Sequence, residues 1–144
     1  MFMFHPYERA VYYYETDKMG IMHHSNYLRI FEEARVDFLN QAGMPFEEIE
    51  SRGIAMPVLS ASCSYKFPLK FNDVFSVYFI IEKFNGVSMS VLYKVYNKKT
   101  GELCAEGTSS HCFTNSELKP IRIKKLHHDI YQIFDDYMKN PIIK

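Results

Sequence analysis

A single carboxylate, Asp17, stands a few residues ahead of a glycine, two histidines and a strongly helical segment. Backbone N–H groups at a helix start have no partners within the helix, and the helix dipole favours negative charge there. A carboxylate beside such a start could act in hydrolysis, while the N–H groups bind the oxyanion that forms. The alternative is that Asp17 only shapes a turn, as loop aspartates commonly do.

The residues between Asp17 and the helix bear on that choice. Gly20 allows a backbone turn that other residues avoid, and the N–H groups that follow it can point at a bound oxygen. Either His23 or His24 could hydrogen-bond a substrate carbonyl or Asp17, although a packing role is equally open for His23. Two adjacent histidines are a poor metal site, because a metal needs three or four ligands. No metal is therefore expected here.

The helix that must position these residues is expected over residues 26–42, where apolar side chains recur at helical spacing. Ser25 or Asn26 can cap its start, and Gly43 ends it. The residues expected to face the core are Tyr27, Leu28, Phe31, Ala34, Phe38, Leu39 and Ala42.

Strands account for most of the remaining chain. The first is expected over residues 7–14, before a loop over residues 15–25. From Met56 the apolar period changes to two, which is typical of a strand with one buried face. Three more strands, separated by turn signals, are expected over residues 74–83, 87–97 and 102–114. A last helix is expected over residues 124–139, with Leu126, Ile130, Ile133, Phe134 and Tyr137 facing inward.

This element order predicts an α+β fold in one domain over residues 1–144. One long helix would be wrapped by a curved antiparallel sheet of about five strands, the last four of them in a meander, with a C-terminal helix added. The strand expected over residues 74–83 is apolar on both faces in part, so a sheet face and an edge would remain uncovered. Self-association would cover them.

Composition narrows the class of protein. A chain of 144 residues with 47% hydrophobic residues suffices for one domain with a real core. Lysine plus arginine equals aspartate plus glutamate at 17 each, which argues against a nucleic-acid partner. Three cysteines without close spacing indicate reduced thiols. The sequence predicts neither a signal peptide nor a transmembrane segment. A cytoplasmic protein is therefore expected.

Two blocks of the sequence resemble a known family. The first is the run Tyr14-x-x-Asp17-x-x-Gly20-x-x-x-His24-x-x-Tyr27, followed by Glu33-Ala34-Arg35. The second extends from Tyr65 to Asp73, where a strand ends in a proline turn and an aspartate. Together they resemble the hotdog-fold acyl-CoA thioesterases of the 4-hydroxybenzoyl-CoA thioesterase type, including the YbgC-like group, over about residues 7–115.

The resemblance implies a fold, an assembly and a site. It implies a hotdog fold and a homodimer whose sheets join edge to edge, or a homotetramer of such dimers, with active sites between subunits. Asp17 matches the family's catalytic acid, and the backbone N–H of His24 matches its carbonyl-polarising group. Gly20, His23 and Tyr27 are expected to support these two, although His23 stands where many YbgC-like members carry an aromatic residue.

The function expected is hydrolysis of acyl-CoA thioesters to free acid and CoA, without a cofactor. Asp17 would act as nucleophile or as general base for water, with Glu32 and Glu33 as fallback carboxylates. One alternative is an enoyl-thioester hydratase or dehydratase that uses His24 with Asp17, and another is a non-catalytic acyl-thioester binding protein. Candidate cations for the CoA phosphates are Lys66, Lys70, Arg29, Arg35, Lys94 and Lys98, and candidate acyl-pocket residues are Ile21, Met22 and Met56.

Overall fold

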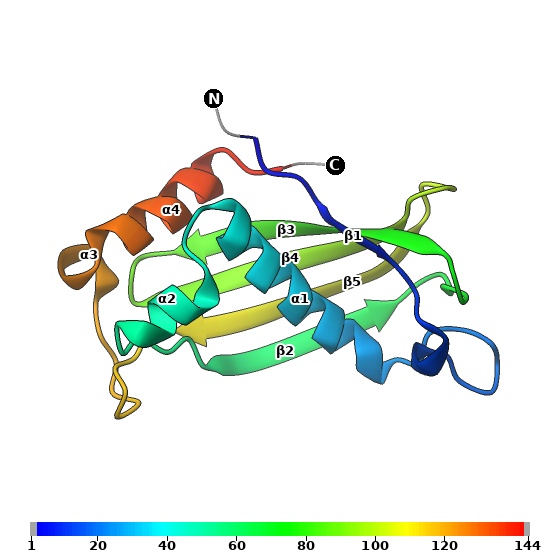
Figure 1. Cartoon of the computed structure of the whole chain (residues 1–144), viewed down its shortest axis with the longest axis horizontal. Helices are drawn as coiled ribbons and strands as arrows, with labels where there is room; N and C mark the ends of the chain where they lie inside the picture. The colour runs from blue at the N-terminus through cyan, green and yellow to red at the C-terminus, as the bar shows by residue number, and fades with distance from the viewer. Residues whose placement is uncertain (1–2, 143–144) are drawn as a thin grey trace.

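A five-stranded antiparallel sheet with helices packed in front of it makes up the computed structural model, which describes residues 3–142 (Figure 1). The strands are β1 (Tyr7–Ala10), β2 (Val58–Tyr65), β3 (Val74–Phe84), β4 (Ser88–Asn97) and β5 (Leu103–Cys112). The helices are α1 (Ser25–Gln41), α2 (Phe46–Ser51), α3 (Ile123–Leu126), α4 (His128–Lys139) and a 3-10 turn, η1 (Tyr13–Glu15). The predicted α+β class and five strands are confirmed. The single domain predicted over residues 1–144 includes residues 1–2 and 143–144, which lie outside the described residues.

The strand order corrects one prediction. The sheet has the order β1-β3-β4-β5-β2, so only β3, β4 and β5 form a meander. β2 does not pair with β3 but lies on the far side of β5, where Ala61 is opposite Ser109. The side chains of the two strands agree with this placement. β3 carries several buried residues and lies inside the sheet, whereas β2 is serine-rich and exposed along almost its whole length. β2 is therefore a sheet edge.

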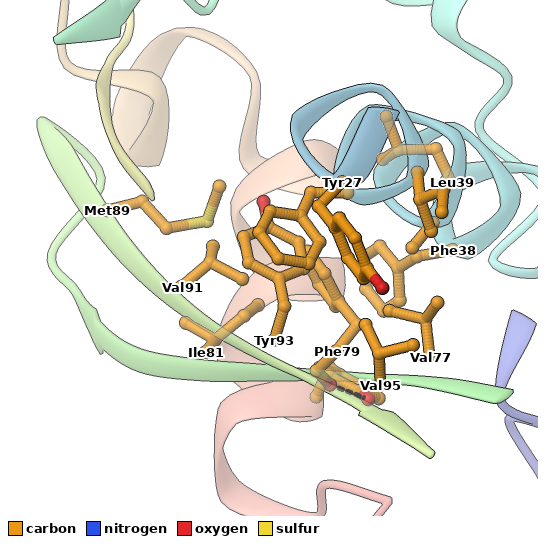
Figure 2. Packing of buried hydrophobic residues seen from close by; sticks show 14 of the residues in the cluster. Tyr27, Phe38, Leu39, Val77, Phe79, Ile81, Met89, Val91, Tyr93 and Val95 are labelled. Atoms are coloured by element: carbon orange, nitrogen blue, oxygen red, sulfur yellow. Dashed lines mark hydrogen bonds between the residues drawn. The ribbon is translucent and has the colours of Figure 1, made fainter. Parts of the chain in front are cut away.

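The core lies between α1 and the sheet. Figure 2 shows Phe38 of α1 beside Phe79 of β3, and their ring centroids are 4.9 Å apart. Phe31 stacks on Tyr93 of β4, with ring centroids 4.4 Å apart and planes inclined by 7°. A glycine permits this approach, because a Cβ at Gly107 of β5 would lie 2.4 Å from the Phe31 ring. The distance between α1 and the sheet thus depends on the lack of a side chain at position 107.

Several predicted boundaries and core residues are wrong. β1 ends at Ala10, since residues 13–15 form η1 instead of continuing the strand. The last helix is broken at His127, whose φ of −141° is not helical, into α3 and α4. Leu28 and Leu126, both expected inward, are exposed, and the neighbouring Ile30 and Ile123 are buried in their place. Within the described residues, no helix is long and apolar enough to cross a membrane.

Candidate active site

Asp17 lies in a tight turn ahead of α1. Its backbone N–H donates to the carbonyl of Ile21 at 2.9 Å, and its own carbonyl accepts from the N–H of Gly20 at 2.9 Å. Gly20 has a φ of +79°, which only glycine adopts readily. The Met19 N–H donates to Asp17 Oδ1 at 2.8 Å. The turn therefore orients the carboxylate through one oxygen, and no other hydrogen bond to that carboxylate forms within residues 3–142.

The second sequence block lies against this turn. The N–H of Met22 donates to the carbonyl of Leu69 at 2.7 Å, and Ile21 forms an antiparallel bridge with Lys70. Asp73 Oδ2 accepts from the Lys70 N–H at 2.8 Å, which holds the loop after β2 in shape. The two blocks that resemble the family, far apart in sequence, are thus neighbours in the fold.

The start of α1 is tied to the residues before the Asp17 turn. The carbonyl of Glu15 accepts two hydrogen bonds of 2.8 Å, from the His23 N–H and from Asn26 Nδ2. Asn26 is therefore buried, and its side chain links the helix start to Glu15. It is not the helix cap that its sequence position predicts. Ser25 does not cap either, because its N–H and hydroxyl both lie within hydrogen-bond distance of His23 Nδ1, at 3.2 and 2.8 Å.

One backbone N–H at this helix start has no hydrogen-bond acceptor within residues 3–142. The N–H of Asn26 donates to the His23 carbonyl at 3.0 Å, and the N–H of Tyr27 to the His24 carbonyl at 3.3 Å. The Ser25 N–H is used by His23. Within residues 3–142, none of the hydrogen bonds uses the N–H of His24. A free N–H at the positive end of a 17-residue helix can bind a negative oxygen.

Aromatic side chains lie close together at this helix start. The rings of His23 and His24 are 4.2 Å apart, and Tyr65, at the end of β2, donates from its hydroxyl to the His24 carbonyl at 3.4 Å. Tyr65 also meets Tyr27 edge to face at 5.2 Å. Tyr27 is buried, and that burial raises its pKa, so its hydroxyl stays protonated. Tyr27 and His23 are thus in contact with other aromatic rings at the start of α1.

A partly buried ion cluster holds the segment that leads into the site. Arg9 of β1 binds both Glu15 oxygens at 2.8 Å and both Glu33 oxygens at 2.8 and 3.2 Å. Glu15 also accepts from the Tyr12 N–H, and Glu33 from the Tyr7 hydroxyl, each at 2.8 Å. Burial acts against the charge of Glu15, but the bonds from Arg9 and Tyr12 outweigh it and lower the pKa of that carboxyl. The cluster ties β1 and η1 to α1.

Most of the other reactive groups already have structural partners. Glu33 belongs to the Arg9 cluster, and Glu32 is exposed, 4.0 Å from Arg35. Burial raises the pKa of Cys63, and raises that of Cys104 to about 11, so neither thiol is a ready nucleophile. Within the described part of the chain, no group of three or more histidine, cysteine, aspartate or glutamate residues could hold a metal ion.

Sequence reasoning missed the Arg9 cluster and a second buried polar group, Ser109 with His111 on β5. Ser109 Oγ and His111 Nε2 are 2.7 Å apart, and both residues are buried. A charged residue within an aromatic-rich strand was the available signal for Arg9. Alternate polar residues on the core face of a strand were the signal for Ser109 and His111.

Comparison with known proteins places the chain in a family. Residues 11–134 match the sequence pattern described as the Thioesterase-like superfamily. The "Putative esterase" of Aquifex aeolicus (strain VF5) is 35% identical over 130 residues, which cover 90% of this chain and 97% of that protein. The "Putative acyl-CoA thioesterase YneP" of Bacillus subtilis (strain 168) is 35% identical over 133 residues, which cover 92% and 96%. The structure of "DHNA-CoA Thioesterase from Staphylococcus aureus" aligns with a TM-score of 0.86 and 28% identity, over 95% of each chain.

A curved five-stranded sheet in front of which one long helix begins at an acid-bearing turn defines a hotdog-fold protein of the thioesterase type. The chain belongs to the Thioesterase-like superfamily. The predicted fold, resemblance and enzyme class are thereby confirmed. The roles of Asp17, Gly20, His23, His24 and Tyr27 stay predictions.

Proposed function

We propose that this protein hydrolyses acyl-CoA thioesters to a free acid and CoA at the start of α1. The free N–H of His24 carries the proposal, because it offers a donor to a carbonyl oxygen close in sequence to the anchored turn of Asp17. The names of the relatives support the substrate class, since YneP is named as an acyl-CoA thioesterase and the Staphylococcus aureus protein as a DHNA-CoA thioesterase.

The chemistry follows from the charge that develops on the carbonyl. The thioester oxygen accepts a hydrogen bond from the His24 N–H and becomes negative on attack, and such a donor contributes about 3 kcal/mol to transition-state binding. In the nucleophilic route, Asp17 forms an acyl anhydride while the C–S bond breaks and CoA leaves as thiolate; water then hydrolyses the anhydride. In the general-base route, Asp17 takes the proton of an attacking water. Only the backbone N–H and one carboxylate are required, so no cofactor takes part.

A second copy of the chain is part of the proposal. The sheet edge β2 exposes Val58, Leu59 and Tyr65 beside unpaired backbone groups, which is a surface that strand pairing covers. A homodimer or homotetramer with the site near that edge is expected, in the cytoplasm. Lys66 and Lys70, exposed on the loop next to the Asp17 turn, are the proposed cations for the CoA phosphates.

Two substitutions at position 24 test the oxyanion donor directly. His24 has a φ of −54°, which proline can adopt, and proline is tolerated at a helix start. His24→Pro removes the N–H, whereas His24→Ala keeps it. Free-thiol release should fall about 100- to 1,000-fold in His24→Pro and stay near the wild-type rate in His24→Ala.

Asp17→Asn is measured in the same assay, with the exposed Glu82→Gln as control. Loss of general-base or nucleophilic action should lower the rate by at least about 100-fold in Asp17→Asn alone. Equal rates in wild type and Asp17→Asn would contradict the proposed role. Loss of enoyl absorbance without thiol release would instead favour the hydratase, and binding without turnover would favour the binding protein.

A further inference from the structure

A small pocket opens between α1 and the sheet edge β2. It encloses about 240 Å³ and is lined by Leu28, Arg29, Phe31, Glu32, Arg35, Val58, Ala61 and Ser109. This is below the range of roughly 300–1,000 Å³ that is usual for drug-sized ligands, so the pocket suits an acyl group better than a whole CoA. Its walls combine apolar side chains with two guanidinium groups and one carboxylate.

The pocket lies along the helix from the proposed reaction centre. Leu28 is one turn beyond His24, and Arg35 follows eleven residues after His24. At the rise of an α-helix, this places the Arg35 backbone about 16 Å from that of His24, and the side chain leans back toward the helix start. An acyl group whose carbonyl binds the His24 N–H would therefore extend along α1 toward the Arg35 guanidinium.

Arg35 has unused hydrogen-bond donors. Its side chain is only 18% exposed, yet within residues 3–142 it makes one hydrogen bond, from Nη1 to the Tyr93 hydroxyl at 2.9 Å. Its contact with Glu32 is 4.0 Å long, and the Glu32 side chain is 71% exposed. A guanidinium has five N–H donors, and a largely buried one that uses a single donor favours an acceptor from outside the chain.

The groups behind Arg35 already satisfy one another. The Tyr93 hydroxyl accepts from the guanidinium and shares a second hydrogen bond with Ser109 Oγ, 2.7 Å away. Ser109 Oγ is in turn hydrogen-bonded to His111 Nε2 at 2.7 Å. Burial, with the charge of Arg35, lowers the pKa of His111 to about 4, so this ring is neutral. This series of hydrogen bonds ends at His111, so only the remaining N–H donors of Arg35 are available to a ligand.

We infer that this pocket selects acyl groups that end in a carboxylate, which binds the free N–H groups of Arg35. This inference rests on the proposed thioesterase function and names its substrate class. A carboxylate matches the planar fork of a guanidinium with two parallel hydrogen bonds. The two arginines of the pocket outnumber its single, largely exposed carboxylate, which gives the pocket a net positive charge.

The test compares two acyl-CoA substrates of equal chain length, suberyl-CoA and octanoyl-CoA, in free-thiol release and in calorimetric binding. Both acyl chains are long enough to extend from the His24 N–H to the Arg35 guanidinium. Wild type should prefer suberyl-CoA at least about tenfold, the ratio that one charge-assisted hydrogen bond can supply. Arg35→Met should lose that preference. Arg35→Lys, which keeps the charge but not the fork, should fall between. The control Arg52→Met removes an arginine that pairs with Asp129 outside this pocket and should keep the preference.

Each outcome has one meaning. Thiol release from octanoyl-CoA by wild type reports on the proposed function alone, whereas the ratio of the two substrates, in rate or in Kd, reports on Arg35. Equal Kd values for both substrates in wild type would overturn the inference even if hydrolysis is observed. Equal losses with both substrates in a folded Arg35→Met variant would also overturn it, as would dissociation of the oligomer in light scattering, because a carboxylate of a second copy would then be the partner of Arg35.

Discussion

Arg9 and Arg35 are both largely buried, with side chains 11% and 18% exposed, but their partners differ. Arg9 donates to Glu15, to Glu33 and to the Ala10 carbonyl, which occupy the donors of all three guanidinium nitrogens. Arg35 donates to one neutral hydroxyl. The first arginine is therefore saturated by its own chain and holds segments together, whereas the second keeps donors for a ligand.

The same contrast applies to the groups around each arginine. Glu15 and Glu33 surround Arg9 with negative charge, and the Glu33 carboxylate, after burial, helps to raise the pKa of Tyr7 to about 12. No carboxylate lies within hydrogen-bond distance of Arg35 among the described residues, and its charge acts on the neutral His111. Removing Arg9 should therefore lower stability most, whereas removing Arg35 should change substrate selection with little loss of stability.

The largest effect is expected for Arg9→Met, which leaves Glu15 and Glu33 without their cation. Breaking a buried pair in this way costs about 3–5 kcal/mol in the free energy of unfolding. Urea unfolding followed by circular dichroism measures it. Arg52→Met, which breaks a surface pair with Asp129, is the control and should shift the urea midpoint much less, because exposed ion pairs contribute little to stability. Similar midpoints for the two variants would mean that the Arg9 cluster does not hold the fold.

A change of pH should have an intermediate effect on stability, because it changes the protonation of His111, which is only 1% exposed. Its pKa in the folded protein, about 4, lies below the ordinary 6.5, so the unfolded chain binds more protons between these values and stability falls as pH falls. Between pH 7 and 5 the loss is about 2 kcal/mol. Urea midpoints across this range should show it in wild type and lose it in His111→Gln.

The two clusters titrate in different ranges, which sharpens this measurement. The pKa of Glu15 is lowered from its ordinary 4.5, so the stability it contributes is present above pH 4.5 and is lost only at lower pH. A pH dependence between 7 and 5 that persists unchanged in His111→Gln would contradict the assignment to the Arg35 side of the molecule.

The smallest effect on stability is expected for Arg35→Met. This substitution removes one hydrogen bond to Tyr93 and a long contact to Glu32, and it should cost about 1 kcal/mol in urea unfolding. Loss of the positive charge should also raise the pKa of His111 and narrow its pH range. A cost as large as that of Arg9→Met would show that Arg35 is structural and not reserved for a ligand.

Features that depend on near neighbours in sequence were predictable. The helical period gave α1 to within a residue at each end, and the period of two gave β3, β4 and β5. The turn of Asp17 and Gly20 also forms locally, as expected. Leu28 was misplaced because the helical stripe is wide, and sequence spacing does not tell which border residue faces the sheet.

The amino-acid sequence by itself determined most of the helices and strands, the family and the candidate acid, because turns, periods and motif spacing are local properties of the chain. Only the tertiary structure decided that β2 lies at the sheet edge and that Arg9 is saturated while Arg35 is not. The partners of these arginines come from distant segments, Glu33 for Arg9 and Tyr93 for Arg35. Such bonds form only when packing brings the segments into register, which no local pattern encodes.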